Sequence, residues 1–407
     1  MVHQIPAVKQ AWWHREDAFG SVLYAPDGTM VVVNLLETVI DLDAIATNTR
    51  ILKNLVQPAQ LMCVVKADGY NHGAIPVART VLANGADQLG VATLAEALEL
   101  REAGITAPIL CWIWSPDQDF AAALDVNIHP AVVSMAHAHA IVKYAADKPE
   151  KLVQTTIKID TGLHRSGVDE SQWEAVFTLF RDAGAATGNI EVTGVMSHLA
   201  CADDPDNSAN ETQAAAFNRA IALGRQLGLE LPVNHLSNSP AVLTRPDFYH
   251  EMVRPGLAVY GYSPFADGND YGLQPAMSWV GKVTVVKPIE PGEGTSYNLT
   301  WQAAKPGYLA VIPAGYADGL PRRAQNHVEV TIGGHRYPQV GRICMDQFVI
   351  DLGDNSHNVR PGDEAIIFGP GGMSATELAS RIQDINYAVI CAPTGRTVRR
   401  YLGGQHA

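Results

Sequence analysis

The chain has 407 residues, 47% of them hydrophobic and 17% charged, so it can bury a large core and is too long for one ordinary domain. Such a composition excludes a disordered chain. The formal net charge of −13, without a run of Lys and Arg, argues against nucleic acid or an anionic membrane surface as the main partner.

The five cysteines are widely scattered and include no Cys-x-x-Cys pair. This spacing argues against a disulfide framework or a zinc site and favours a reducing cytoplasm. Residues 1–17 contain no apolar core of signal-peptide length, and no stretch approaches the ~20 apolar residues of a membrane helix. We therefore expect a cytoplasmic protein.

Residues 1–35 show no clear period and are predicted to form an N-terminal extension, part of which could pair with a later sheet. Residues 36–270 alternate short β-rich runs with helical patterns, which predicts a parallel sheet. Helices are clearest at 94–104 and 211–228, and another helix at 41–56 precedes the first strand. Eight candidate strands lie at 61–67, 88–93, 108–114, 127–133, 154–160, 191–198, 233–239 and 251–257. That number predicts a (β/α)8 TIM barrel.

The helical signal fades in residues 271–407. Runs such as GYLAVIPAGY, VEVTIGG and QVGRICMDQFVIDL are typical of strands broken by Pro and Gly turns, and one helix is expected at 374–383. We predict a second, mainly antiparallel β domain here.

Active sites of such barrels lie at the carboxyl ends of the strands. This rule selects a small set of polar residues: Lys66, Lys158, His198, Asn238 with Ser239, and Arg254 with Gly256. Lys66 follows four apolar residues, where an ammonium is costly to bury, and a neutral amine there is a nucleophile able to form a Schiff base. The alternative is an ordinary strand-end lysine that reaches solvent.

The backbone N–H groups of Gly256 and Leu257, with Ser239 and Tyr70, are suited to hold a phosphate at the position where this kind of barrel often binds one. The alternative is a tight turn from strand to helix.

Lys158 and Arg165 are two cations near one rim, which suits a carboxylate, or else they form a solvated surface. His198 and His235 end two strands, and hydrogen bonding explains them better than metal ligation, because no third ligand has suitable spacing. Tyr297 and Tyr316 interrupt strands of the β domain, where core or interface tyrosines are the common case.

Taken together, these segments are similar to the bacterial alanine racemases, barrel-fold enzymes that use pyridoxal phosphate (PLP). The resemblance runs from about residue 36 to 402 and rests on the joint order of its motifs. They are VVKADGYNHG, KIDTGLHRSG, SHLA, HLSNSPAVL, RPGLAVYG, SYN, IPAGYADGLPRR, VGRICMDQ and INYAVIC.

The resemblance implies that Lys66 carries PLP as a Schiff base and acts as the base for the D-enantiomer. Tyr297 is then the base for the L-enantiomer and comes from the other subunit of a homodimer. Arg165 and the backbone of Met345 hold the substrate carboxylate. Removing a proton from one face and returning one to the other needs two such groups.

The resemblance also assigns supporting roles. Lys158 matches a position that is often carbamylated in this family, where it orients the arginine, and Arg254 faces the pyridine nitrogen. The remaining implied PLP contacts are Tyr70, His198, Asn238, Ser239, Gly256, Leu257 and Tyr387. The residues implied to support the site are His235, Tyr316, Cys344 and Asp346.

The chain departs from the family pattern at four positions. It has Asp68 and Gly69 for the usual Asn and Ala, Asn298 for the usual Gly after the catalytic tyrosine, and Ala388 for the usual Glu. Asn298 is the change expected to alter the loop at Tyr297.

Four other functions stay open at this point. They are a racemase of another or broader amino-acid range, a barrel-fold PLP decarboxylase, a non-catalytic PLP-binding protein, and a metal-dependent barrel enzyme. Arg254 argues against the decarboxylase, which is expected to place an acid beside the pyridine nitrogen. A role in supplying D-alanine for peptidoglycan is implied by the resemblance alone.

Overall fold

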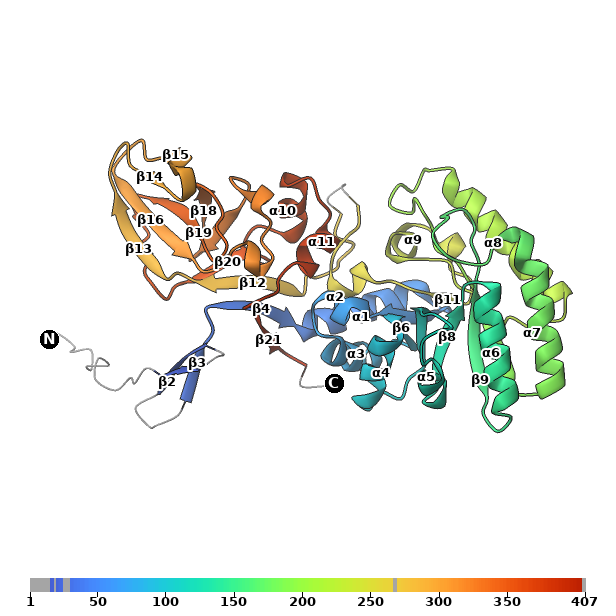
Figure 1. Ribbon diagram of the computed structural model, residues 1–407. Coiled ribbons are helices and arrows are strands. Elements are labelled where there is room, and N and C mark those ends of the chain that lie inside the picture. The colour runs from blue at the N-terminus through green and yellow to red at the C-terminus, as the bar shows by residue number, and fades with distance from the viewer. Residues whose placement is uncertain (1–14, 18–19, 25–29, 266–268, 405–407) are drawn as a thin grey trace. The chain divides into compact units, whose positions relative to one another are not determined.

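The protein is described here by a computed structural model, which covers residues 15–17, 20–24, 30–265 and 269–404 (Figure 1). Two compact units divide the chain. One consists of residues 41–276 and 402–407, and the other of residues 1–40 and 277–401.

The first unit contains a curled sheet of parallel strands in the order β10-β9-β8-β7-β6-β5-β11. Its strands are β5 (Gln60–Val64), β6 (Gln88–Thr93), β7 (Ile109–Ile113), β8 (Ile128–Val132), β9 (Val153–Lys158), β10 (Ile190–Met196) and β11 (Met252–Val253). The strands β5 to β10 are neighbours in the sheet, and helices connect each of them to the next, as the alternation in the sequence predicted.

The predicted strand at 233–239 does not form, although its backbone closes the ring. Val233 N donates to Thr193 O at 2.9 Å beside β10, and Arg254 N donates to Ser237 O at 2.9 Å beside β11. An isolated parallel bridge joins Met196 of β10 to His235, and His235 N donates to Val195 O at 3.1 Å. The expected (β/α)8 barrel is thus present, with an irregular seventh segment.

Helices cover the outside of this sheet (Figure 1). The longer ones are α1 (Leu42–Val56), α3 (Ala74–Ala83), α4 (Leu94–Glu102), α6 (Met135–Asp147), α7 (Trp173–Thr187) and α8 (Ala209–Gln226). Short helices are α2 (Lys66–Tyr70), α5 (Ala121–Asp125) and α9 (Ser239–Thr244). The carboxylate of Asp41 caps α1 by accepting hydrogen bonds from Asp43 N and Ala44 N. The sequence-predicted helices at 41–56, 94–104 and 211–228 are confirmed within two residues.

A cluster of buried apolar side chains is formed by strand residues of this sheet. Its members are Met62, Leu110, Ala131, Met196 and Met252, with Trp112 and Val233 packed against it. This cluster supports the strand ends, where the polar residues of the predicted site begin.

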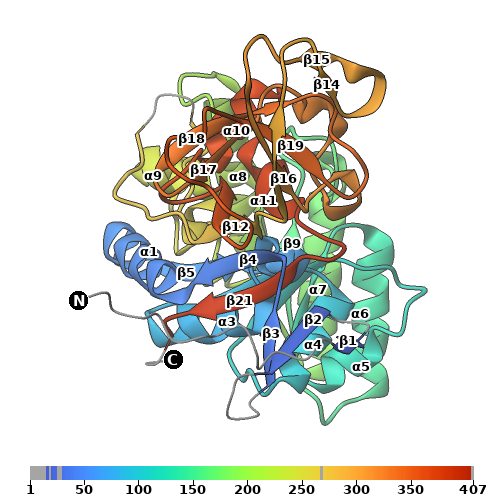
Figure 2. The ribbon, with the colours of Figure 1, turned by 90° about the vertical axis from the view of Figure 1, so that its left-hand side faces the viewer.

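The second unit is built on a sheet of nine strands in the order β13-β16-β19-β18-β17-β20-β12-β4-β21. The strands are β4 (Leu36–Asp41), β12 (Met277–Lys282), β13 (Val285–Ile289), β16 (Gly307–Ile312), β17 (Glu329–Ile332), β18 (His335–Val340), β19 (Phe348–Gly353), β20 (Glu364–Phe368) and β21 (Val398–Leu402). The pairs for which a register is described are antiparallel, which confirms the predicted β domain. Figure 2 shows β12, β4 and β21 side by side.

Two further parts of this unit bear on the site. The short strands β14 (Gly294–Thr295) and β15 (Trp301–Gln302) flank a single-turn helix at Tyr297–Leu299. Helices α10 (Ala375–Arg381) and α11 (Asn386–Cys391) follow β20. The helix expected at 374–383 is confirmed, whereas α11, which carries Tyr387, was recognised only as a motif.

The described strands of the N-terminal segment are β1 (Arg15–Asp17), β2 (Gly20–Tyr24) and β3 (Met30–Val33). They pair with one another in a separate antiparallel sheet, so the expected pairing with a later sheet is wrong for these strands. Among the described residues, no helix combines the length and hydropathy that crossing a membrane requires.

Candidate active site

The carboxyl ends of the barrel strands bring the predicted cations together. Lys66 follows β5, Lys158 ends β9, and Arg254 follows β11. Their charges, with that of Arg165, act on His198 after β10, whose pKa is lowered to about 3 by burial first and then by Arg254, Arg165, Lys66 and Lys158. The imidazole of His198 is therefore neutral at pH 7 and serves as a hydrogen-bonding group.

The turn that follows Lys66 has an unusual backbone. Residues Ala67, Asp68, Gly69, Tyr70 and Asn71 all have left-handed dihedral angles, with φ between 51° and 66°. Each non-glycine residue in this region costs about 1–2 kcal/mol, least for Asn and Asp. The whole turn therefore requires support from its surroundings.

The two departures from the family pattern in this turn fit that backbone. Asp68 is a residue type that tolerates φ of 51°, and its Oδ1 accepts a hydrogen bond of 2.7 Å from Ala74 N at the start of α3. Gly69 has φ of 62°, and a Cβ atom there would approach the Ala74 backbone to 3.3 Å. Asp68 and Gly69 are thus both compatible with the backbone of this turn.

Two aromatic rings flank the Lys66 side chain. Its Nζ lies 5.7 Å from the ring centroid of Tyr70 and 5.9 Å from that of Trp112. A Cβ atom on Gly90 would lie 2.9 Å from Trp112, so the absent side chain at residue 90 leaves room for the indole. These rings limit the directions in which the amine can point.

Small groups form a cradle next to Lys66. The Ser239 hydroxyl accepts hydrogen bonds from Gly256 N at 2.9 Å and Ala258 N at 3.2 Å. Asn238 caps α9 through a bond from Ala241 N of 3.4 Å. The Tyr70 hydroxyl lies 2.2 Å from the position that a Cβ atom on Gly256 would occupy. The N–H groups of Gly256 and Ala258 therefore converge on the Ser239 hydroxyl near that of Tyr70, and such a cluster of donors suits a phosphate.

Arg254 is 5% exposed, and its guanidinium donates to His235 Nδ1 at 2.9 Å, to His235 O at 2.6 Å and to Ser197 O at 2.5 Å. Burial lowers the pKa of Arg254 to about 9, so the group still carries its charge at pH 7. A guanidinium only donates, hence Nδ1 of His235 is an acceptor and the imidazole is neutral. No carboxylate within the described part of the chain pairs with Arg254.

Lys158 is also buried, at 5% exposure, and donates a hydrogen bond to the Ser166 hydroxyl. Burial, followed by the charges of Arg165 and Arg254, lowers the pKa of Lys158 to about 8. Roughly one lysine in ten is then neutral at pH 7. Arg165 itself is exposed in the loop after β9. The rim therefore presents an exposed cation next to a partly neutral amine.

The β domain brings Tyr297 and Tyr316 to one hollow of about 550 Å³, which Asn298, Arg322, Arg342 and Ile343 also line. Tyr297 is 67% exposed and Tyr316 44% exposed. Asn298 has φ of 63°, a value that Asn adopts more readily than other non-glycine residues. The expected disturbance at this departure is therefore small, because the backbone keeps a conformation natural to glycine.

Met345 lies in the loop between β18 and β19. Its carbonyl accepts a bond of 3.0 Å from Ala317 N, and a Cβ atom on Gly315 would lie 2.2 Å from that carbonyl. Its own N–H has no partner in the described residues, which leaves it available to a ligand. Cys344 belongs to the same loop, and its carbonyl accepts from Tyr316 N at 3.2 Å.

Asp346 is fixed by an ion-pair network. Arg396 donates from Nη1 to Asp346 at 2.8 Å and from Nη2 to Asp318 at 2.7 Å. The Asp318 side chain is completely buried and also accepts from Gly315 N at 3.0 Å. The network thus holds the loops that carry Tyr316 and Met345.

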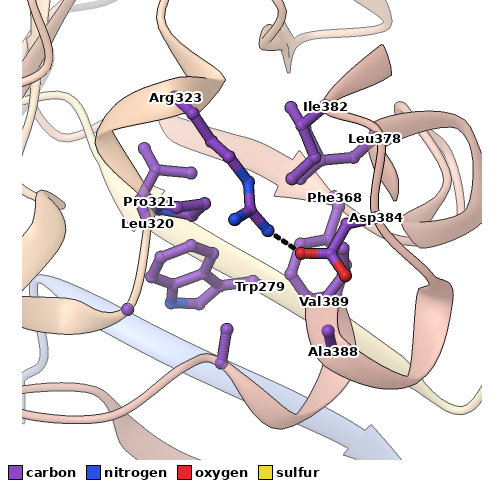
Figure 3. Close-up of a pocket in the computed structure, with 12 residues that line it drawn as sticks. Trp279, Leu320, Pro321, Arg323, Phe368, Leu378, Ile382, Asp384, Ala388 and Val389 are labelled. Atoms are coloured by element: carbon purple, nitrogen blue, oxygen red, sulfur yellow. Dashed lines mark ion pairs between the residues drawn. The ribbon is translucent and has the colours of Figure 1, made fainter. Parts of the chain in front are cut away.

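A second cavity, of about 150 Å³, lies between the loop at 319–323 and helices α10 and α11 (Figure 3). Arg323 and Asp384 form an ion pair at its edge, and Trp279, Phe368 and Leu378 form part of its apolar lining (Figure 3). Ala388, the fourth departure, lines it too, next to Tyr387 on α11.

Comparisons with known proteins cover both units. The alanine racemase N-terminal domain family matches residues 40–264, and the alanine racemase C-terminal domain family matches residues 276–401. The chain belongs to the alanine racemase family. An alanine racemase from Corynebacterium efficiens is 62% identical over 371 residues, which is 91% of this chain and 99% of that protein.

Solved structures of the alanine racemase family agree with this assignment. The enzyme from Corynebacterium glutamicum is 56% identical, with a TM-score of 0.81 over 91% of this chain and 100% of its own. The enzyme from the D-cycloserine producer Streptomyces lavendulae is 38% identical, with a TM-score of 0.88 over 92% of this chain and 98% of its own.

The alanine racemase family uses PLP, and the barrel residues are suited to that group. PLP carries a phosphate, and the substrate brings a carboxylate. The barrel end offers a cradle of N–H groups and the cations Lys66, Lys158, Arg165 and Arg254, and the acid Asp160 raises the pKa of Lys158. An anionic cofactor offsets this excess of positive charge.

Some residues that shape the site were missed in the sequence. Ser166 pairs with Lys158, Arg396 holds Asp346, and Glu96 bonds to the residue after Lys66. Glu96 had a recognisable signal, because Thr93-x-x-Glu96 before an apolar run is the pattern of a helix capping box. No local sequence pattern predicts the roles of Ser166 and Arg396, because their partners are brought next to them only when the chain folds.

Proposed function

We propose that this protein interconverts L-alanine and D-alanine, with PLP bound through Lys66. Both domains of the alanine racemase family match the chain, and relatives that carry this name match along their whole length. When bound, PLP draws electrons away from the α-carbon of the amino acid and so makes its proton removable. The protein supplies the groups that bind the substrate and move the proton.

The two proton-moving groups are Lys66 and Tyr297 of the partner subunit. Lys66 Nζ takes or returns the proton on one face of the α-carbon, and the phenol oxygen of Tyr297 does so on the opposite face. Each direction of the reaction uses one group as base and the other as acid, because inversion needs removal and delivery on different sides.

The substrate carboxylate is held by Arg165 and by the N–H of Met345. Arg165 is an exposed cation, so we propose that a carbamylated Lys158 orients it. The lowered pKa of Lys158 supports this role, because only a neutral amine accepts carbon dioxide. Ser166, which already pairs with Lys158, is placed to bond to the modified group.

The observation that carries the racemase proposal is the environment of Arg254. This buried guanidinium bonds to a neutral histidine and to backbone carbonyls, and no carboxylate of the described residues pairs with it. If Arg254 faces the pyridine nitrogen of bound PLP, as the family resemblance implies, its charge would disfavour protonation of that nitrogen. The arrangement therefore favours racemisation over decarboxylation or transamination.

We further propose a homodimer whose two active sites each draw residues from both subunits. Tyr297 and Met345 are 67% and 52% exposed in the single chain, which is unusual for large side chains that belong to a site. A second copy of the chain would cover them. The protein would act in the cytoplasm to supply D-alanine for peptidoglycan.

A chiral assay with L-alanine, L-serine and L-lysine tests the proposal. We expect formation of D-alanine at a rate at least ten times that for the other two substrates, with no amine produced. Comparable rates for all three would indicate a racemase of broader range, and amine formation would indicate a decarboxylase. Borohydride treatment should attach PLP to Lys66. A Lys66→Ala variant should neither form D-alanine nor retain PLP after borohydride treatment.

A further inference from the structure

The backbone N–H of Ala67, the residue directly after Lys66, is bound by a carboxylate from a neighbouring part of the barrel. Glu96 Oε1 accepts a hydrogen bond of 2.8 Å from Ala67 N, across 29 positions in the sequence. Ala67 itself is exposed, so this bond and not burial is what restrains the amide. A hydrogen bond to an ionised carboxylate is stronger than one between neutral groups.

The second oxygen of Glu96 belongs to another element. Oε2 accepts from Ala92 N at 2.8 Å and from Thr93 N at 3.0 Å, at the point where β6 ends and α4 begins. The Thr93 hydroxyl in turn accepts from Glu96 N at 3.3 Å, which completes a capping box. A capping box needs one carboxylate oxygen only, so the bond to Ala67 is additional to it.

This additional bond acts where support is most needed. The five residues that follow Lys66 are all left-handed, and four of them are not glycine. Such a turn persists only where the surrounding structure supports it. Asp68 holds it to α3 through Ala74 N, and Glu96 holds its first amide to the end of β6.

We propose that Glu96 is the positioning residue for Lys66, since it fixes the start of the left-handed turn and thereby the direction of the lysine side chain. The inference rests on the proposed function of Lys66. Glu96 acts through the Ala67 amide, so it sets where Nζ lies and not the chemistry that Nζ performs.

Three variants separate this role from simple helix capping. Glu96→Ala removes both functions of the carboxylate. Thr93→Ala removes the threonine half of the capping box and leaves the bond to Ala67. Glu96→Gln retains a single carbonyl oxygen, which serves only one of the two elements. Thr93→Ala is thus a matched control for the stability of α4.

Hydrogen–deuterium exchange of the PLP-loaded dimer gives the decisive readout. In Glu96→Ala we expect amide exchange in residues 66–71 to rise at least tenfold and kcat to fall at least tenfold, with the KM for alanine within threefold of wild type. Thr93→Ala should lower the melting temperature and leave both the exchange and kcat within threefold of wild type. Glu96→Gln should lie between the two.

The proposal is overturned if Glu96→Ala and Glu96→Gln leave exchange in residues 66–71 unchanged, or if they lower kcat no more than Thr93→Ala does. If Glu96→Ala does not fold, Glu96→Gln against Thr93→Ala makes the same comparison. Failure of the proposed function is a separate result: wild type would then yield no borohydride-trapped PLP on Lys66, whatever the exchange shows.

Discussion

The hydroxyl of Tyr70 lies 2.2 Å from the position that a Cβ atom on Gly256 would occupy. No side chain larger than hydrogen fits at residue 256 unless the tyrosine moves. Because Tyr70 also flanks Lys66, this single close approach links the phosphate cradle to the proposed catalytic lysine.

Replacing Gly256 with Ala should therefore weaken PLP binding. We expect the dissociation constant of PLP, measured by spectrophotometric titration of the cofactor-free protein, to rise at least tenfold. This factor corresponds to about 1.4 kcal/mol. Gly184→Ala on α7 is the matched control, because the nearest atom to its added Cβ is at 3.7 Å. A Gly256→Ala protein that binds PLP like the control would show that the cradle does not hold the phosphate.

Asn298 tests whether the backbone at Tyr297 must be left-handed. Asn298→Gly should keep wild-type racemase activity, because glycine adopts a φ of 63° without cost. Asn298→Val should lose at least tenfold in activity, because a β-branched residue is strained at positive φ and would reshape the loop. Initial rates in both directions measure the effect. Equal activity of the two variants would contradict a role for this conformation.

The Arg396 network should contribute to both stability and substrate binding. Arg396→Ala leaves the fully buried Asp318 carboxylate without its cation, so we expect a loss of about 2 kcal/mol in the free energy of unfolding. Asp346→Asn breaks only the exposed ion pair between Arg396 and Asp346, so it should lower the free energy of unfolding by under about 0.5 kcal/mol. The same variant should raise the KM for alanine. Chemical denaturation and steady-state kinetics separate the two effects.

The pKa of His198 predicts a dependence of stability on pH in the cofactor-free protein. Its folded-state pKa of about 3 lies below the ordinary 6.5, so the unfolded chain gains a proton first as the pH falls. Folding stability is therefore lost between pH 6.5 and pH 3. The variant His198→Gln lacks this titrating group and should not show this loss. The melting temperature of wild type minus that of the variant should therefore fall by about 3 °C or more between pH 7 and pH 4. A constant difference would contradict a buried, neutral His198.

Much of the barrel was predictable because its strands and helices differ in period and are separated by Gly and Pro. The segment at 233–239 shows the limit of this reasoning. Its composition is typical of a strand, but in the folded chain it is joined to β10 by an isolated bridge between Met196 and His235. This pairing depends on a residue 39 positions away in the sequence, which no local pattern reports.

The candidate site divides in the same way. Lys66 and Arg254 were selected because they end strands of a barrel, a rule that follows from topology. The role of Arg396 could not be predicted from the sequence, because its two carboxylate partners come from separate loops of the β domain. Glu96 is intermediate, since its capping box was visible in the sequence but its bond to Ala67 appears only in the folded chain.

The central claim is that Lys66 of one subunit and Tyr297 of the partner subunit act on the same substrate molecule. The most direct measurement is complementation between Lys66→Ala and Tyr297→Phe, each inactive alone, after the two proteins are unfolded and refolded together. A mixed dimer would contain one site with both residues intact, so random pairing should restore about a quarter of wild-type racemase activity. Recovery near that level supports the shared site. No recovery, in a sample where differently tagged subunits co-purify as mixed dimers, would contradict it.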